Sequence, residues 1–183
     1  MNKMSSIKRA TITAVCIALC YVLPLAFHAV GAGPVFAPMH LPVLLCGLIC
    51  GSGFGLFCGI AGPVLSCVLS GMPTATQLIY FVPELMLYGF VTGLMLDLVH
   101  TQKLLPDLYI ALLTAMLAGR VVGGIAQALF YLGSGQTFTV AAIAAGYFVR
   151  ALPGIISQLI VTPILVSTLM KARLISNRYP KGE

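Results

Sequence analysis

The sequence of 183 residues has no tryptophan and very little charge. Ten residues are basic and four are acidic, so charged residues make up 8% of the chain, whereas hydrophobic residues make up 60%. Soluble domains carry about 25% charged residues, because their surfaces must stay hydrated. The scarcity of charge therefore argues against a soluble enzyme, a nucleic-acid-binding protein and a secreted scaffold held by disulfides.

The sequence also lacks the motifs of metal and nucleotide sites. The six cysteines lie inside hydrophobic runs without CxxC spacing, and no two histidines follow HxxxH spacing. Because a structural zinc site needs four suitably spaced ligands, we interpret the cysteines as small packing residues. The ATP-binding pattern GxxxxGK[ST] is absent as well. We therefore expect no metal, no bound cofactor and no nucleic-acid partner for this chain.

Long hydrophobic runs are present instead. The mean hydropathy of the chain is +1.05. At about 20 residues per membrane-spanning helix, the chain has room for roughly six helices. We predict an all-α, multi-pass integral membrane protein with six transmembrane helices in a single domain, residues 1–183. The expected helices cover residues 8–30, 39–50, 53–69, 77–99, 108–132 and 140–170.

Small residues recur at four-residue spacing in the second and third expected helices. Glycine occupies positions 47, 51, 55, 59 and 62, a pattern that allows close helix approach in a membrane. Ahead of these helices, the segment 31–42 holds two glycines and three prolines and cannot form a regular helix. Because irregular backbone at membrane depth must be enclosed by protein or water, we predict a lid or a re-entrant segment there.

The basic residues indicate the orientation of the chain. They cluster at the two termini and in one middle connection, whereas the segments 31–41, 70–77 and 133–139 contain no lysine or arginine. Because basic residues concentrate on the cytoplasmic side of a membrane protein, we predict that both termini lie inside. The basic residues at the termini and in the middle connection are Lys3, Lys8, Arg9, Lys103, Lys171, Arg173, Arg178 and Lys181.

Three charged residues lie deep inside expected spans, away from their ends: Glu84, Arg120 and Arg150. Each costs about 2.5–3.5 kcal/mol at the bilayer centre, so they must face one another, a cavity or a ligand. One interpretation is a structural Glu–Arg pair. The other is an anion-binding site, since two arginines exceed one glutamate and a ligand carboxylate or phosphate would balance them. The candidate substrate-binding residues are His40, Gln77, Tyr80, Glu84, Tyr88, Arg120, Gln127 and Arg150.

Several blocks of sequence resemble one known family. They are an alanine stripe at Ala10, Ala14 and Ala18 directly after Lys8-Arg9, and the segments 38–47, 70–73 and 83–89. In this order, they resemble the substrate-binding S-components of energy-coupling factor (ECF) vitamin transporters. The resemblance covers nearly the whole chain and implies six helices with both termini inside, and a binding pocket near the outer face.

The resemblance also implies a function and partners. An S-component captures a vitamin or related small molecule at the outer face of the bacterial cytoplasmic membrane. The alanine stripe of Ala10, Ala14 and Ala18 would dock on a transmembrane coupling subunit. Two cytosolic ATPases would use the ATP, so we expect no enzymatic activity in this chain. The alternative is an intramembrane enzyme, or an assembly partner in which the Glu–Arg cluster is structural.

Overall fold

The computed structural model describes residues 4–29, 31, 38–133, 152–172 and 174–175, and every regular element within these ranges is an α-helix. Five of the described helices, all except α3, are long and apolar enough to cross a membrane. The prediction of an all-helical, multi-pass membrane protein is therefore confirmed. The helices are α1 (Ser6–Ala29), α3 (His40–Cys50), α4 (Ser52–Ser70), α5 (Ala75–Leu98), α6 (Leu104–Gly133) and α8 (Leu152–Lys171).

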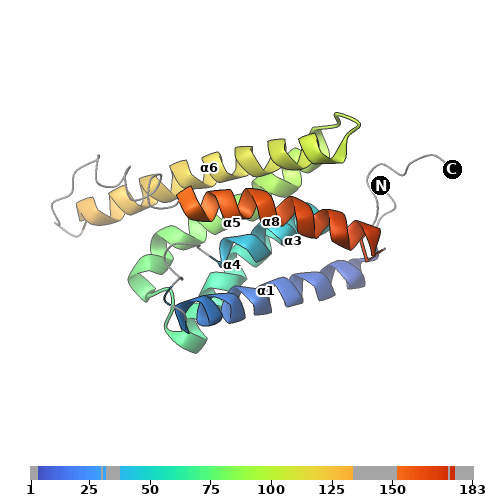
Figure 1. Cartoon of the computed structure of the whole chain (residues 1–183). Coiled ribbons are helices and arrows are strands. Elements are labelled where there is room, and N and C mark those ends of the chain that lie inside the picture. The colour runs from blue at the N-terminus through green and yellow to red at the C-terminus, as the bar shows by residue number, and fades with distance from the viewer. Residues whose placement is uncertain (1–3, 30, 32–37, 134–151, 173, 176–183) are drawn as a thin grey trace.

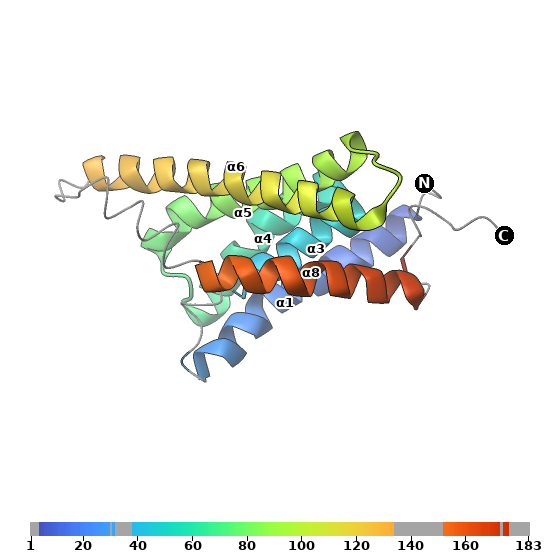
Figure 2. The same ribbon diagram turned by 45° about the horizontal axis from the view of Figure 1, so that its top comes forward.

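The helices lie side by side, and successive helices reverse direction along the bundle (Figures 1 and 2). The start of α1 and the end of α8 lie at the same end of the molecule. Helix α3 packs against α1, α4, α5 and α8 and is buried over almost its whole length. Its 11 residues span about 16 Å at 1.5 Å per residue, which is about half of the hydrocarbon thickness of a bilayer.

Glycines bring the backbones of α3, α4 and α5 into direct contact. A Cβ atom added at Gly55 or Gly89 would collide with the backbone of the other residue, and one at Gly59 would collide with the backbone of Leu85. Gly47 is equally close to the carbonyl oxygen of Gly89. The close packing predicted from the glycine spacing is therefore confirmed at positions 47, 55 and 59, while Gly62 packs against the side chain of Cys20.

Gly51 departs from this pattern, because it forms the turn between α3 and α4. Its φ angle is 95°, a left-handed conformation that L-residues with a side chain rarely adopt. No atom lies within 4 Å of where its Cβ would be, so the residue is required for the turn and not for helix packing.

The cysteines pack where α1, α3 and α4 meet. All six are free thiols, and all except Cys67 are buried. The Sγ atom of Cys46 lies 3.5 Å from Thr13 Oγ1, and that of Cys50 lies 3.6 Å from the carbonyl oxygen of Arg9. Thiols of α3 thus contact the inner face of α1, as expected for small packing residues.

Among the helices whose starts lie inside a described range, α6 departs most from its expected start, at residue 104 instead of 108. Helix α6 begins at Leu104, so Asp107 lies in its first turn, where it is buried and accepts hydrogen bonds from the backbone N–H and the hydroxyl of Thr101 at 2.9 and 2.6 Å. Pro106 is tolerated there, because first-turn N–H groups have no helical partner. For the same reason Pro42 fits the first turn of α3, so the expected irregular segment ends before His40; its residues 32–37 lie outside the described part of the chain.

Candidate functional site

Helix α5 supplies the centre of the site. Its start is fixed by a capping box, in which Gln77 N–H donates to Thr74 Oγ1 and Thr74 N–H donates to Gln77 Oε1. Two turns further on, Glu84 and Tyr88 lie four residues apart and therefore on one face. Glu84 is 2% exposed and Tyr88 is fully buried. The carboxylate of Glu84 thus lies in the interior of the bundle.

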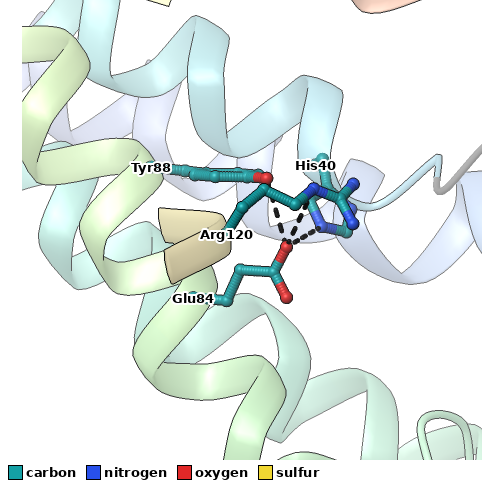
Figure 3. Close-up of polar contacts among 4 residues, drawn as sticks. All are labelled: His40, Glu84, Tyr88 and Arg120. Atoms are coloured by element: carbon teal, nitrogen blue, oxygen red, sulfur yellow. Dashed lines mark hydrogen bonds and ion pairs between the residues drawn. The ribbon is translucent and has the colours of Figure 1, made fainter. Parts of the chain in front are cut away.

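Three polar side chains from three helices converge on one oxygen atom of Glu84 (Figure 3). The Tyr88 hydroxyl donates a hydrogen bond to Oε1 over 3.1 Å. His40 Nε2, at the start of α3, lies 3.4 Å from the same atom, and Arg120 Nε, on α6, lies 3.6 Å from it. All four side chains are buried, so the ion pair is shielded from water.

Two glycines allow α6 to approach this carboxylate. A Cβ atom at Gly123 would lie 2.9 Å from both Cβ and Oε2 of Glu84. One at Gly119 would collide with the ring of Tyr88. Gly119 precedes Arg120 directly and Gly123 lies three residues after it, so α6 approaches α5 closely enough for the guanidinium group to reach Glu84. These glycines are not among the predicted site residues, although a glycine on each side of an arginine within one helical turn is a usable signal.

Aromatic rings border the cluster. The ring centroid of His40 lies 5.1 Å from that of Tyr88 and 6.1 Å from that of Phe81. Phe81 in turn lies 5.7 Å from the ring of Tyr80, which is also buried. The carboxylate therefore lies in a largely apolar and aromatic environment, which strengthens every charge interaction within it.

The guanidinium group of Arg120 approaches Glu84 with Nε, and its terminal nitrogens lie on the side away from the carboxylate (Figure 3). This contact through Nε differs from the bidentate arrangement, in which two N–H groups of one arginine bind both oxygens of one carboxylate. A planar guanidinium presents five N–H donors, so Arg120 is able to hold Glu84 and a second acceptor together. The geometry is compatible with both a structural pair and an anion-binding site.

The remaining predicted site residues have different positions. Tyr80 lies next to the cluster, because its ring packs on Phe81, which borders His40. Gln127 is half-buried on α6, whereas Gln77 is exposed and caps α5. Arg150 lies outside the described residues, so its place relative to Glu84 stays a prediction. The structure thus brings together His40, Glu84, Tyr88 and Arg120, with Tyr80 beside them.

The alanine stripe lies on the outer face of α1. Ala10, Ala14 and Ala18 are all exposed, while Thr13 and Cys16 on the opposite face are buried. Helix α1 lies at the edge of the bundle (Figure 1) and packs on α3 and α4. The stripe is therefore a smooth surface that faces away from the rest of the described chain.

Comparison with known proteins gives one match. A family model described as "ECF transporter, substrate-specific component" matches residues 8–166. No curated protein and no solved structure matches the chain. The matched range contains the alanine stripe, the glycine contacts and all eight candidate substrate-binding residues.

Proposed function

Since the chain belongs to the family of substrate-specific components of ECF transporters, we propose that it captures a vitamin or related small molecule. Capture takes place at the outer face of the bacterial cytoplasmic membrane, and partner subunits complete the uptake. The observation that carries the proposal is the buried group of His40, Glu84, Tyr88 and Arg120 within membrane-spanning helices. Ionisable residues are rare at such depth and commonly mark substrate pathways.

The proposed topology has six spans with both termini in the cytoplasm. The alternating directions of the described helices support it, as does the common end at which α1 starts and α8 finishes (Figures 1 and 2). Lys8 and Arg9 in the first turn of α1 and Lys171 at the end of α8 lie at that end. The positive-inside rule then makes this end cytoplasmic.

In the proposed binding mode, the terminal nitrogens of Arg120 bind an acidic or strongly accepting group of the substrate. Glu84 holds the Arg120 side chain through Nε, and His40 and Tyr88 hold Glu84. Arg150 supplies a second positive charge in this proposal. Tyr80 and Gln127 border the same region and contribute uncharged contacts.

The proposed partners are a transmembrane coupling subunit and two cytosolic ATPases, which hydrolyse the ATP. The exposed stripe of Ala10, Ala14 and Ala18 would dock on the coupling subunit, because small side chains permit close approach of helices in lipid. This chain then contributes substrate recognition and no catalysis.

A second candidate role is a membrane assembly partner in which the cluster only holds helices together. One observation favours it: Tyr88 and His40 hydrogen-bond Glu84 Oε1 and Arg120 forms an ion pair with the same oxygen, so the charge of Glu84 is compensated within the chain. Removing one member of a buried ion pair destabilises a protein by about 3–5 kcal/mol. If the cluster binds the substrate, removal of Arg120 should mainly weaken substrate binding. If the cluster only holds helices together, the removal should mainly lower the stability of the protein.

The experiment compares ligand binding with stability. Mass spectrometry of small molecules released from the purified protein identifies the substrate. Arg120→Ala should weaken its binding by about 10- to 150-fold, because a charge-assisted hydrogen bond contributes about 1.5–3 kcal/mol. Glu84→Gln should also weaken binding by changing how Arg120 is held. If Arg120→Ala and Arg150→Ala both bind the substrate normally and only lose thermal stability, the cluster is structural.

A further inference from the structure

Helix α8 carries two buried polar residues outside the cluster around Glu84. Gln158 is 2% exposed and Thr162 is 0% exposed. They lie four residues apart and therefore on the same face of the helix. Helix α8 packs against α3 and α6, the two helices that supply His40 and Arg120 to the cluster. Both polar groups therefore lie on the face of α8 that is buried in the bundle.

The hydroxyl of Thr162 differs from those of the other threonines within described helices. Beyond the first turn of a helix, each of the others donates to the carbonyl oxygen four residues earlier. These threonines are Thr11, Thr13, Thr92, Thr114 and Thr168. Thr162 Oγ1, in contrast, is buried and has no hydrogen-bond partner in the structure described for this chain. A buried hydroxyl in this state costs free energy, so its retention needs an explanation.

Pro163 adds a backbone acceptor to the same turn. Proline has no N–H group, so the carbonyl oxygen of Leu159 lacks the donor that a regular helix would place there. Pro163 itself is buried, which puts this turn on the inner side of α8. One helical turn therefore combines a hydroxyl, a carbonyl oxygen and the side-chain amide of Gln158.

The missing charge on α8 restricts what could bind to this turn. Between Leu152 and Lys171, the only charged residue is Lys171 at the end of the helix. A charged group bound at Thr162 would be buried without a counter-charge from α8, which is strongly unfavourable. An uncharged group with both a donor and an acceptor matches the hydroxyl, the amide and the carbonyl oxygen.

We propose that Gln158, Thr162 and the Leu159 carbonyl form a subsite for an uncharged hydrogen-bonding group of the transported molecule, such as a hydroxyl, a carboxamide or a lactam edge. This inference rests on the proposed function. The substrate then has two recognised parts: an acidic or accepting group at Arg120 and a neutral polar group at α8.

The test uses three variants of the full chain. Thr162→Val removes the hydroxyl with little change of shape, and Thr162→Ser keeps a hydroxyl. Thr92→Val is the matched control, because Thr92 is equally buried but its hydroxyl donates to the carbonyl oxygen of Tyr88. The probe is the mixture of small molecules released by denaturing wild-type protein, quantified by mass spectrometry per mole of each variant as purified. Thermal stability is measured after a wash that removes the retained molecules.

We expect Thr162→Val to retain at least tenfold less of the released molecule, with an unchanged or higher melting temperature when washed. Thr162→Ser should retain an amount close to that of wild type. The melting temperature of Thr92→Val should fall, because the substitution removes the hydrogen bond from the Thr92 hydroxyl to the carbonyl oxygen of Tyr88.

Three results would overturn the subsite. If Thr162→Val retains as much of the small molecule as wild type does, the Thr162 hydroxyl does not contact that molecule. Thr162→Val with a melting temperature as low as that of Thr92→Val would make the hydroxyl structural. A released molecule without any uncharged hydrogen-bonding group would contradict the chemistry. Wild-type protein that releases no small molecule would instead overturn the proposed function together with the subsite.

Discussion

Two stripes of small residues with the same spacing have opposite positions in this molecule. Ala10, Ala14 and Ala18 lie on the exposed face of α1. Gly55 and Gly59 lie in a buried contact where α4 meets α5 backbone to backbone. Both stripes repeat every four residues, so spacing alone does not tell an internal contact from an external one.

The other faces of the helices account for the difference. Helix α1 buries Thr13, Cys16 and Cys20, which turns the alanine stripe outward. On α4 and α5 the glycines themselves lie on the inward face, and the absence of Cβ atoms lets the backbones touch. Alanine side chains give α1 a smooth outer surface. Glycine has no side chain, so the backbone of a neighbouring helix can pack directly against it. A stripe of small residues should therefore be interpreted together with the residues on the opposite face of its own helix.

The largest expected effect comes from adding a methyl group to the buried contact. Gly89→Ala would place a Cβ against the backbone of Gly55, which cannot rotate away. We expect a loss of about 3 kcal/mol or more and little folded protein, since overpacking of a rigid contact is severely destabilising. The control is Gly124→Ala on α6, where no atom lies within 4 Å of the added Cβ. Equal melting temperatures for the two variants would show that α4 and α5 are not in backbone contact.

A bulky residue on the exposed stripe should have a different effect. Ala14→Trp is expected to leave folding and ligand binding intact and to abolish assembly with the coupling subunit, because the side chain separates two helices that must approach closely. Leu117→Trp is a control at a position that is 60% exposed on α6, away from α1. Co-purification with the ATPase subunits measures assembly. Recovery of a normal complex with Ala14→Trp would contradict the docking role.

A glycine next to the candidate site distinguishes packing from binding. Gly123→Ala would place a Cβ 2.9 Å from Glu84 Oε2, so the carboxylate must shift relative to Arg120. We expect substrate affinity to fall by about tenfold, equivalent to about 1.4 kcal/mol. Gly124→Ala, one residue along the helix, should bind like wild type. Titration of both purified variants with the identified substrate is the measurement; unchanged affinity in Gly123→Ala would place Glu84 outside the binding site.

Much of the described fold follows from the sequence, because the hydrophobic runs predict the helical class and the approximate limits of the described helices. The boundaries shifted where proline and aspartate act in a first turn. Pro106 and Asp107 look like loop residues by composition, yet they start α6, since the carboxylate binds Thr101 and the ring needs no N–H. Composition alone cannot distinguish a polar loop from a capped helix start.

The site was predictable in part. Glu84 and Arg120 were predicted because a charged side chain inside an apolar span is energetically unfavourable unless it has a partner. The partners of Glu84 were less certain, since Tyr88 follows from helical spacing but His40 depends on how α3 packs. Gln77 illustrates the limit: its polarity predicts a binding role, and the sequence alone does not show that its side chain also forms the capping box of α5. The selection among polar residues at similar depth is decided by tertiary contacts that the sequence does not contain.

The smallest expected effect tests the contact between α1, which carries the alanine stripe, and α4, which carries Gly55 and Gly59. A Cβ atom at Gly62 of α4 would lie 2.8 Å from Sγ and 3.0 Å from Cβ of Cys20, on the buried face of α1. Here the obstacle is mainly a side-chain atom and not a backbone, so α1 has some freedom to adjust. We expect Gly62→Ala to cost about 1 kcal/mol, at the lower end of overpacking effects.

Removing the obstacle should restore part of that loss. In the double variant Gly62→Ala and Cys20→Ala, the Sγ atom is gone and only the 3.0 Å approach of the two Cβ atoms is left. A double-mutant cycle on melting temperatures therefore should show the two substitutions to be less harmful together than the sum of the single variants. Gly124→Ala combined with Cys20→Ala should show no such coupling, because no atom lies within 4 Å of the Cβ added at Gly124. Simple additivity at Gly62 would mean that α1 and α4 are not in contact at this point, and that the inner face of α1 does not fix the outward direction of the alanine stripe.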